Sequence, residues 1–75
     1  MEMNTQDCLK KALLDTQEKV RDFMAYADVI EDKELSKCFR EFAKVEGLQA
    51  QKLQEHIVMF FIYLLKYYFN KSIQK

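Results

Sequence analysis

The stretch EFAKVEGLQAQKLQEH, residues 41–56, has the pattern of the middle of one long helix. It belongs to a predicted inward stripe whose steps of three and four residues keep its members on one helix face: Phe39, Phe42, Glu46, Gln49, Leu53, His56, Phe60, Tyr63 and Tyr67. The stripe is apolar at both ends and polar in the middle, where Glu46 and Gln49 lie one helical turn apart. The pattern therefore predicts a helix-packing face that polar side chains interrupt.

Length and composition favour a single all-α domain spanning residues 1–75. The chain has no Pro and one Gly, and it is rich in Ala, Leu, Glu, Lys, Gln and Met, which favours helices over strands joined by tight turns. A chain this short buries a limited core and often depends on a metal, disulfides or a partner chain.

Two helices are expected, at about residues 5–28 and about residues 33–69. Asn4 or Thr5 can cap the first helix, and Asp32 is the expected cap of the second. The seam of the first helix alternates steps of four and three residues: Leu9, Leu13, Thr16, Val20, Phe23, Ala27 and Ile30. The short connection makes the helices antiparallel, so that residues at one level have numbers that sum to about 62. The first helix then covers the second only as far as about His56.

Beyond that point the second helix continues as an apolar run, IVMFFIYLLKYYF, residues 57–69. This run is shorter than the roughly 20 residues that a membrane span needs, and an uncovered apolar surface normally marks a contact site. We expect it to form the core of an oligomer, most simply a C2 homodimer in which two hairpins build a four-helix bundle. The expected interface residues are Phe60, Phe61, Leu64, Tyr67 and Tyr68. The alternatives are a helix that lies in a membrane surface, with Lys66 and Lys71 at the headgroups, and an end without structure.

The formal net charge is zero, so composition favours no general attraction to nucleic acid. Residues 1–32 hold eight acids and four bases, whereas residues 57–75 hold three Lys and no acid. An acidic first part and a basic tail favour head-to-tail contact between chains. The polar, acidic N-terminus does not have the pattern of a secretory signal, and two Cys are too few for a disulfide scaffold, which indicates a cytoplasmic protein with reduced thiols.

Neither the two cysteines nor the single histidine is predicted to be catalytic. Cys8 and Cys38 are expected more than about 20 Å apart along the hairpin, so they cannot pair within one chain and are expected to be small buried or half-buried residues. His56 is the only histidine, and its position on the stripe favours a packing role. No nucleophile is expected beside it, so the sequence does not predict a catalytic triad.

Glu46 is the most informative candidate, because a carboxylate on a packing face is costly unless it is paired or bound to a metal. The antiparallel register places it opposite Thr16, with Glu18 half a turn away. One interpretation is a polar layer of Glu46, Gln49 and Thr16 that sets the register. The other is a metal site built from Glu18 and Glu46, with four carboxylates brought together in a dimer.

A family resemblance rests on DKEL at residues 32–35 and on the pattern that follows it, Phe39-x-x-Phe42-Ala43-x-x-Glu46-x-x-Gln49-Ala50-x-x-Leu53. This resembles the second half of a ferritin-like or rubrerythrin-type hairpin, with Lys33 in place of the family's Pro. The resemblance implies two antiparallel helices that form a four-helix bundle by duplication or dimerisation. It also implies that Glu46 matches the metal-binding Glu, that Gln49 replaces the metal-binding His, and that Glu18 is the acid nearest the remaining ligand position.

A neutral Gln is a weak ligand for a transition metal compared with imidazole. The chain is therefore predicted to be a self-associating structural or interaction module with no catalytic residue and no cofactor. The alternatives are an iron- or manganese-binding, ferroxidase-like protein whose site forms between chains, and a peripheral membrane protein that binds through residues 57–69.

Overall fold

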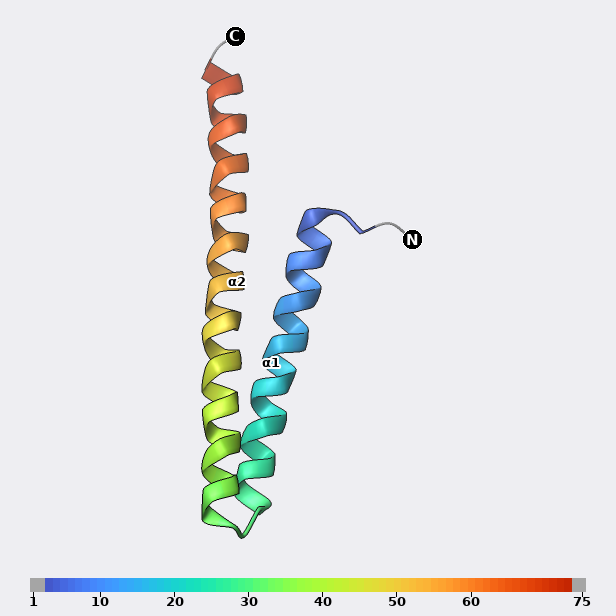
Figure 1. Cartoon of the computed structure of the whole chain (residues 1–75). Coiled ribbons are helices and arrows are strands. Elements are labelled where there is room, and N and C mark those ends of the chain that lie inside the picture. The colour runs from blue at the N-terminus through green and yellow to red at the C-terminus, as the bar shows by residue number, and fades with distance from the viewer. Residues whose placement is uncertain (1–2, 74–75) are drawn as a thin grey trace.

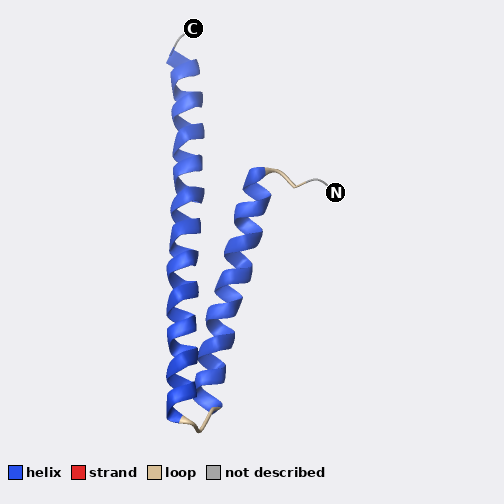
Figure 2. Ribbon diagram, in the orientation of Figure 1, coloured by secondary structure: helices blue, strands red, loops and turns tan. Residues whose placement is uncertain are grey.

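Two helices and a short connection make up the computed structural model, which describes residues 3–73 (Figure 1). Helix α1 spans Thr5–Val29 and helix α2 spans Lys33–Ile73, and residues 3–73 contain no strand (Figure 2). The predicted all-α helical hairpin is confirmed. Helix α1 ends one residue later than expected, and α2 continues past the expected end at residue 69, because Asn70 lowers helix propensity only slightly.

Side-chain caps explain where both helices begin. The Asn4 side chain accepts a hydrogen bond from the backbone N–H of Asp7 at 2.8 Å, and the Asp32 carboxylate accepts one from the N–H of Leu35 at 3.0 Å. Each bond satisfies a backbone donor that a helix start leaves free. At the end of α1 the N–H of Ile30 donates to the Tyr26 carbonyl at 3.0 Å. Both predicted N-terminal boundaries are therefore confirmed.

The closed end of the hairpin confirms the predicted antiparallel register. The Ser36 hydroxyl donates to the Ala27 carbonyl at 2.7 Å, and the rings of Phe23 and Phe39 lie 5.9 Å apart. The residue numbers in these two pairs sum to 63 and 62, which agrees with the expected level rule. Tyr26 and Phe42 complete a cluster of four edge-packed or tilted rings at this end.

The predicted seam of α1 is correct at every position. Thr16 and Ala27 are buried, and the other five members of the seam are half-buried. The strict alternation of four- and three-residue steps explains this result, because it keeps all seven residues on one side of the chain.

The predicted stripe of α2 is only partly correct. Phe39, Glu46 and Leu53 are half-buried, as expected for a face that packs on α1. The other six members of the predicted stripe are exposed: Phe42, Gln49, His56, Phe60, Tyr63 and Tyr67. The observed inner seam of α2 uses the neighbouring position in each heptad: Ala43, Ala50, Ile57 and Leu64. The predicted stripe and the observed seam share Phe39, Glu46 and Leu53. Their remaining members differ by one residue, which is a rotation of about 100° around the helix. The apolar choice prevails because burial favours Ala and Ile and disfavours Gln and His.

The core of the single hairpin is thin. Within the described chain the buried residues are Thr16, Ala27 and Ala43, and no large side chain is fully buried. The helices lie close at the connection and diverge toward the N-terminus of α1, while α2 projects well beyond it (Figure 1). The accessible surface is 6679 Å², compared with about 4,900 Å² expected for a compact folded monomer of 9.0 kDa. The hairpin therefore exposes about 1,800 Å² more surface than a compact monomer of the same mass.

Candidate functional site

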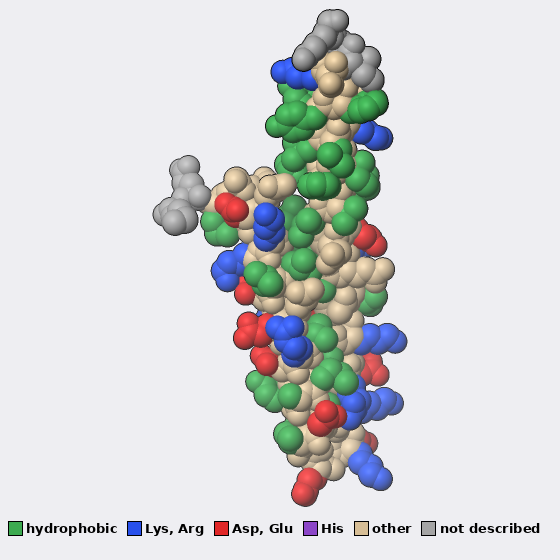
Figure 3. Space-filling model, turned by 180° about the vertical axis from the view of Figure 1, so that it is seen from behind, with side chains coloured by type: hydrophobic (Ala, Val, Ile, Leu, Met, Phe, Trp, Pro, Cys, Tyr) green, Lys and Arg blue, Asp and Glu red, His purple; other side chains and the backbone are tan. Residues whose placement is uncertain are grey.

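The largest uncovered feature is the end of α2. Asn4, Thr5 and Gln6 share a shallow hollow with Phe60, so the start of α1 reaches one turn further along α2 than predicted. Beyond Phe60 no residue of α1 lies level with α2, and the helix there is apolar around most of its circumference. Figure 3 shows these side chains gathered along the projecting part of α2. The alternative of an end without structure is wrong, because the helix continues to Ile73.

The predicted interface residues lie on this projecting segment. Phe61 and Tyr68 are 59% and 68% exposed, and Tyr67 is also exposed. Phe60 is at the margin of exposure, and Leu64 is half-buried. The Tyr67 and Tyr68 rings make an edge contact at 5.9 Å, and the ammonium of Lys71 lies 5.3 Å from the Tyr67 ring centre. These contacts hold the tail side chains against one another and leave their outer faces open.

A second exposed stripe runs along α2 and was missed by the sequence analysis. This outer stripe starts at Cys38 and takes alternating steps of four and three residues to Asn70, and every member is exposed. It lies about a quarter turn from the inner seam. Its members between these two ends are Phe42, Val45, Gln49, Lys52, His56, Met59, Tyr63 and Lys66. The sequence analysis missed this stripe because it assigned four of its members to the inward stripe: Phe42, Gln49, His56 and Tyr63.

The candidate metal ligands are not brought together within one chain. Glu18 is exposed and lies two positions, about 200°, around α1 from the buried Thr16, whereas Glu46 is half-buried on the inner seam and Gln49 is exposed. Among residues 3–73 no group of three or more His, Cys, Asp and Glu side chains could hold a metal ion. A site assembled between chains stays a prediction.

The polar layer expected within the hairpin does not form. The Thr16 hydroxyl donates to the Ala12 carbonyl of its own helix at 2.7 Å, so its one donor is not directed at Glu46. Gln49 lies outside the seam, which removes the third expected member. A Thr inside a helix commonly bonds back to the carbonyl four residues earlier, and that local bond competes successfully with the cross-helix one.

The thiols and the histidine also differ from expectation. Cys8 and Cys38 are free, as predicted, but both are exposed rather than buried. Each immediately precedes a seam residue, Leu9 or Phe39, and one helical position rotates a side chain by about 100° out of the seam. His56 is exposed, so its predicted packing role within the hairpin is wrong.

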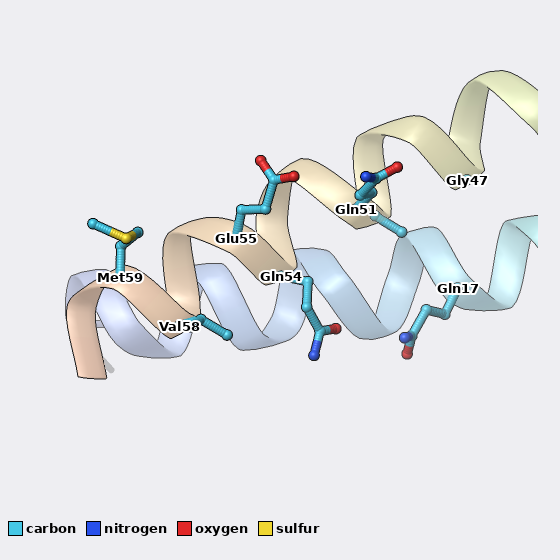
Figure 4. Close-up of a pocket in the computed structure, with 8 residues that line it drawn as sticks. Gln17, Gly47, Gln51, Gln54, Glu55, Val58 and Met59 are labelled. Atoms are coloured by element: carbon cyan, nitrogen blue, oxygen red, sulfur yellow. The ribbon is translucent and has the colours of Figure 1, made fainter. Parts of the chain in front are cut away.

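An open groove of about 550 Å³ lies where the two helices diverge. Gln17 contributes from α1, and Gly47, Ala50 and Gln54 contribute from α2 (Figure 4). Glu55 and Met59 border the groove but point away from α1 (Figure 4). A Cβ atom added at Gly47 would meet no neighbouring atom within 4 Å. The groove therefore results from the divergence of the helices and is lined largely by side-chain amides and small residues.

No family model, no curated protein and no solved structure matches this chain. The resemblance to ferritin-like hairpins therefore stays a prediction. Over residues 3–73, neither helix combines the length and the apolar character that crossing a membrane requires.

Proposed function

We propose that this chain is a small self-associating helical protein, a structural or interaction module in which two hairpins form a homodimeric four-helix bundle. The observation that carries this proposal is the exposed apolar surface of α2. Phe61, Tyr63, Tyr68 and Phe69 are each more than half exposed on a helix that continues past its only partner within the chain. Apolar patches of this size on soluble chains mark interaction surfaces.

The energetics of burial are sufficient for assembly. Fully burying a large apolar side chain contributes about 1.5–3 kcal/mol, so half-burial of ten such residues on the tail contributes on the order of 10 kcal/mol per chain. The loss of translational and rotational freedom on association costs about 4–15 kcal/mol. The two free energies are comparable. Burial of exposed residues elsewhere on the hairpin would add to the favourable free energy of association.

The ferritin-like sequence pattern also supports a homodimeric four-helix bundle. A helix pair that forms a bundle by dimerisation needs a second copy to bury its faces, and the single hairpin buries only three residues among those described. With Gln49 in place of a His, we propose a bundle of this kind that serves as a scaffold and not as a catalyst.

The half-burial of Glu46 on the inner seam favours one second candidate, an iron or manganese site assembled between chains with Glu18. Metal analysis after purification from iron-supplemented cells tests it. Stoichiometric metal that is lost in Glu46→Gln would establish the metal-binding function. A metal-free dimer of normal stability would favour the structural module.

Sedimentation equilibrium of the full chain at micromolar concentration tests self-association. We expect a dimer, and we expect Tyr63→Glu to shift it toward monomer because the substitution places a charge in the proposed contact. The matched control is Leu14→Glu, which changes an equally exposed residue on the outside of α1. A monomeric full chain that floats with anionic liposomes would replace self-association with binding to a membrane surface.

A further inference from the structure

The outer stripe of α2 has a heptad pattern and is exposed at every member, although the Phe42 ring at the hairpin end also lies 6.0 Å from the Phe23 ring of α1. A helix with two seams a quarter turn apart can pack against two neighbouring helices at once, as the helices of a four-helix bundle do. The inner seam is occupied by α1, so the outer stripe is the face left for another helix.

We propose that the outer stripe packs against the outer stripe of a second copy in antiparallel orientation. The two-fold axis lies beside Lys52, and opposed residues have numbers that sum to about 105. This inference rests on the proposed self-association and specifies which faces meet and in which register.

The match of side chains favours this register over a shift of one whole heptad. Phe42 lies opposite the partner's Tyr63, Val45 opposite the partner's Met59, and Gln49 opposite the partner's His56. Apolar residues thus meet apolar residues, and the two polar members meet each other. A shift of one heptad in either direction is worse, because it places Phe42 against the partner's His56 or against the partner's Asn70.

Charges along one edge of the stripe agree with the same register. Lys66 lies within two residues, or about 3 Å, of the level of the partner's Glu41. Lys52 has the same offset from the partner's Glu55, which compensates the approach of the two Lys52 side chains at the axis. All four residues are exposed in the single hairpin. A parallel pairing would place Lys66, as well as Lys52, beside its own copy.

The antiparallel arrangement also covers one face of both tails, the face that carries the outer stripe. Helix α1 covers α2 as far as Phe60, and in this register the hairpin end of the partner, residues 33–45, lies level with residues 60–72. The two chains together expose about 3,600 Å² more surface than compact monomers of the same mass would, so the surface available for burial exceeds the roughly 2,000 Å² of the smaller obligate homodimer interfaces.

Single-cysteine cross-linking tests the register in the full chain. All variants carry Cys8→Ser and Cys38→Ser, and they are treated with a short bis-maleimide and analysed on a denaturing gel. We expect Lys52→Cys to give a covalent dimer, because it lies beside the axis. Val45→Cys and Met59→Cys should not cross-link singly, because each lies about 20 Å along the axis from its own copy. The Val45→Cys/Met59→Cys double variant should cross-link.

Sedimentation of the same variants separates the outcomes. Dimers that cross-link at residues 45 and 59 singly would be parallel, and they would overturn the register while leaving self-association intact. Dimers that cross-link at none of these positions would use a different face, which also overturns this inference alone. A monomeric full chain would overturn both the inference and the proposed function.

A charge reversal provides an independent test. We expect Lys66→Glu to weaken dimerisation about tenfold at low salt, because two symmetry-related ion pairs become repulsive. Adding Glu41→Lys should restore most of the affinity. The control Lys44→Glu changes an exposed Lys outside the stripe and should change the affinity less than about twofold. No rescue by Glu41→Lys would contradict the antiparallel register.

Discussion

Gly47 is the position where the structure makes the clearest prediction about stability. It lies inside α2, its φ is not positive, and an added Cβ would meet no atom within 4 Å. The substitution Gly47→Ala therefore adds a better helix former without a clash or backbone strain. We expect it to raise the free energy of unfolding by about 0.8–1.0 kcal/mol, from helix propensity and the smaller entropy of the unfolded chain. For a chain of this size that corresponds to a rise in Tm of about 4–8 °C.

Thermal and urea unfolding followed by circular dichroism would measure this change, with both proteins at one concentration because a dimer links stability to concentration. Ser36→Ala is a useful comparison. It also places Ala in α2 but removes the 2.7 Å bond to the Ala27 carbonyl, and should destabilise by about 1 kcal/mol. A lower stability of Gly47→Ala would refute the reasoning, because it would mean that another helix occupies the space beside Gly47. The proposed antiparallel dimer leaves that space open, since its contact lies on another face of α2.

Three further predictions concern the cap, the seam carboxylate and the tail. Asp32→Ala should destabilise the protein by about 1 kcal/mol in urea unfolding, because the N–H of Leu35 loses its acceptor, and an unchanged midpoint would show that the cap is replaceable. Glu46→Gln should leave the stability unchanged or raise it, because it removes the cost of a half-buried charge, and a clear loss of stability in a metal-free sample would contradict this. Truncation after His56 should give a monomer or a loosely folded chain in sedimentation and circular dichroism, and a truncated protein that still dimerises tightly would show that the tail serves another purpose.

The α1 half of the fold could be predicted almost residue by residue. Its seven seam residues keep strict four- and three-residue spacing, so that a single face is available for packing. Asn4 and Asp32 are strong cap residues at the only places where the pattern begins anew, which placed both helix starts. The connection is too short for any arrangement but an antiparallel pair, and the register followed from it.

The α2 half could not be predicted in the same way, because two stripes with heptad spacing lie side by side on it. Local pattern alone does not say which stripe meets the partner helix and which faces outward. The choice depends on the level of each residue against α1, where the small Ala43 allows close approach and Gln49 and His56 would lose their hydration. The candidate polar site failed for the same reason, since the rotation of α2 that turns Ala43 and Ala50 toward α1 also moves Gln49 out to the surface.

The sequence by itself determined that the protein is helical, where its helices begin, and that a long apolar segment lies past the end of the first helix. These properties depend on propensity, capping and spacing, which act within a few residues along the chain. The tertiary structure alone decided which face of α2 packs on α1, that Glu18 and Glu46 lie on different sides of the hairpin, and that a second stripe stays uncovered. Those outcomes depend on competition between faces for the same partner helix, and the competition is settled by the burial of apolar side chains across the whole interface.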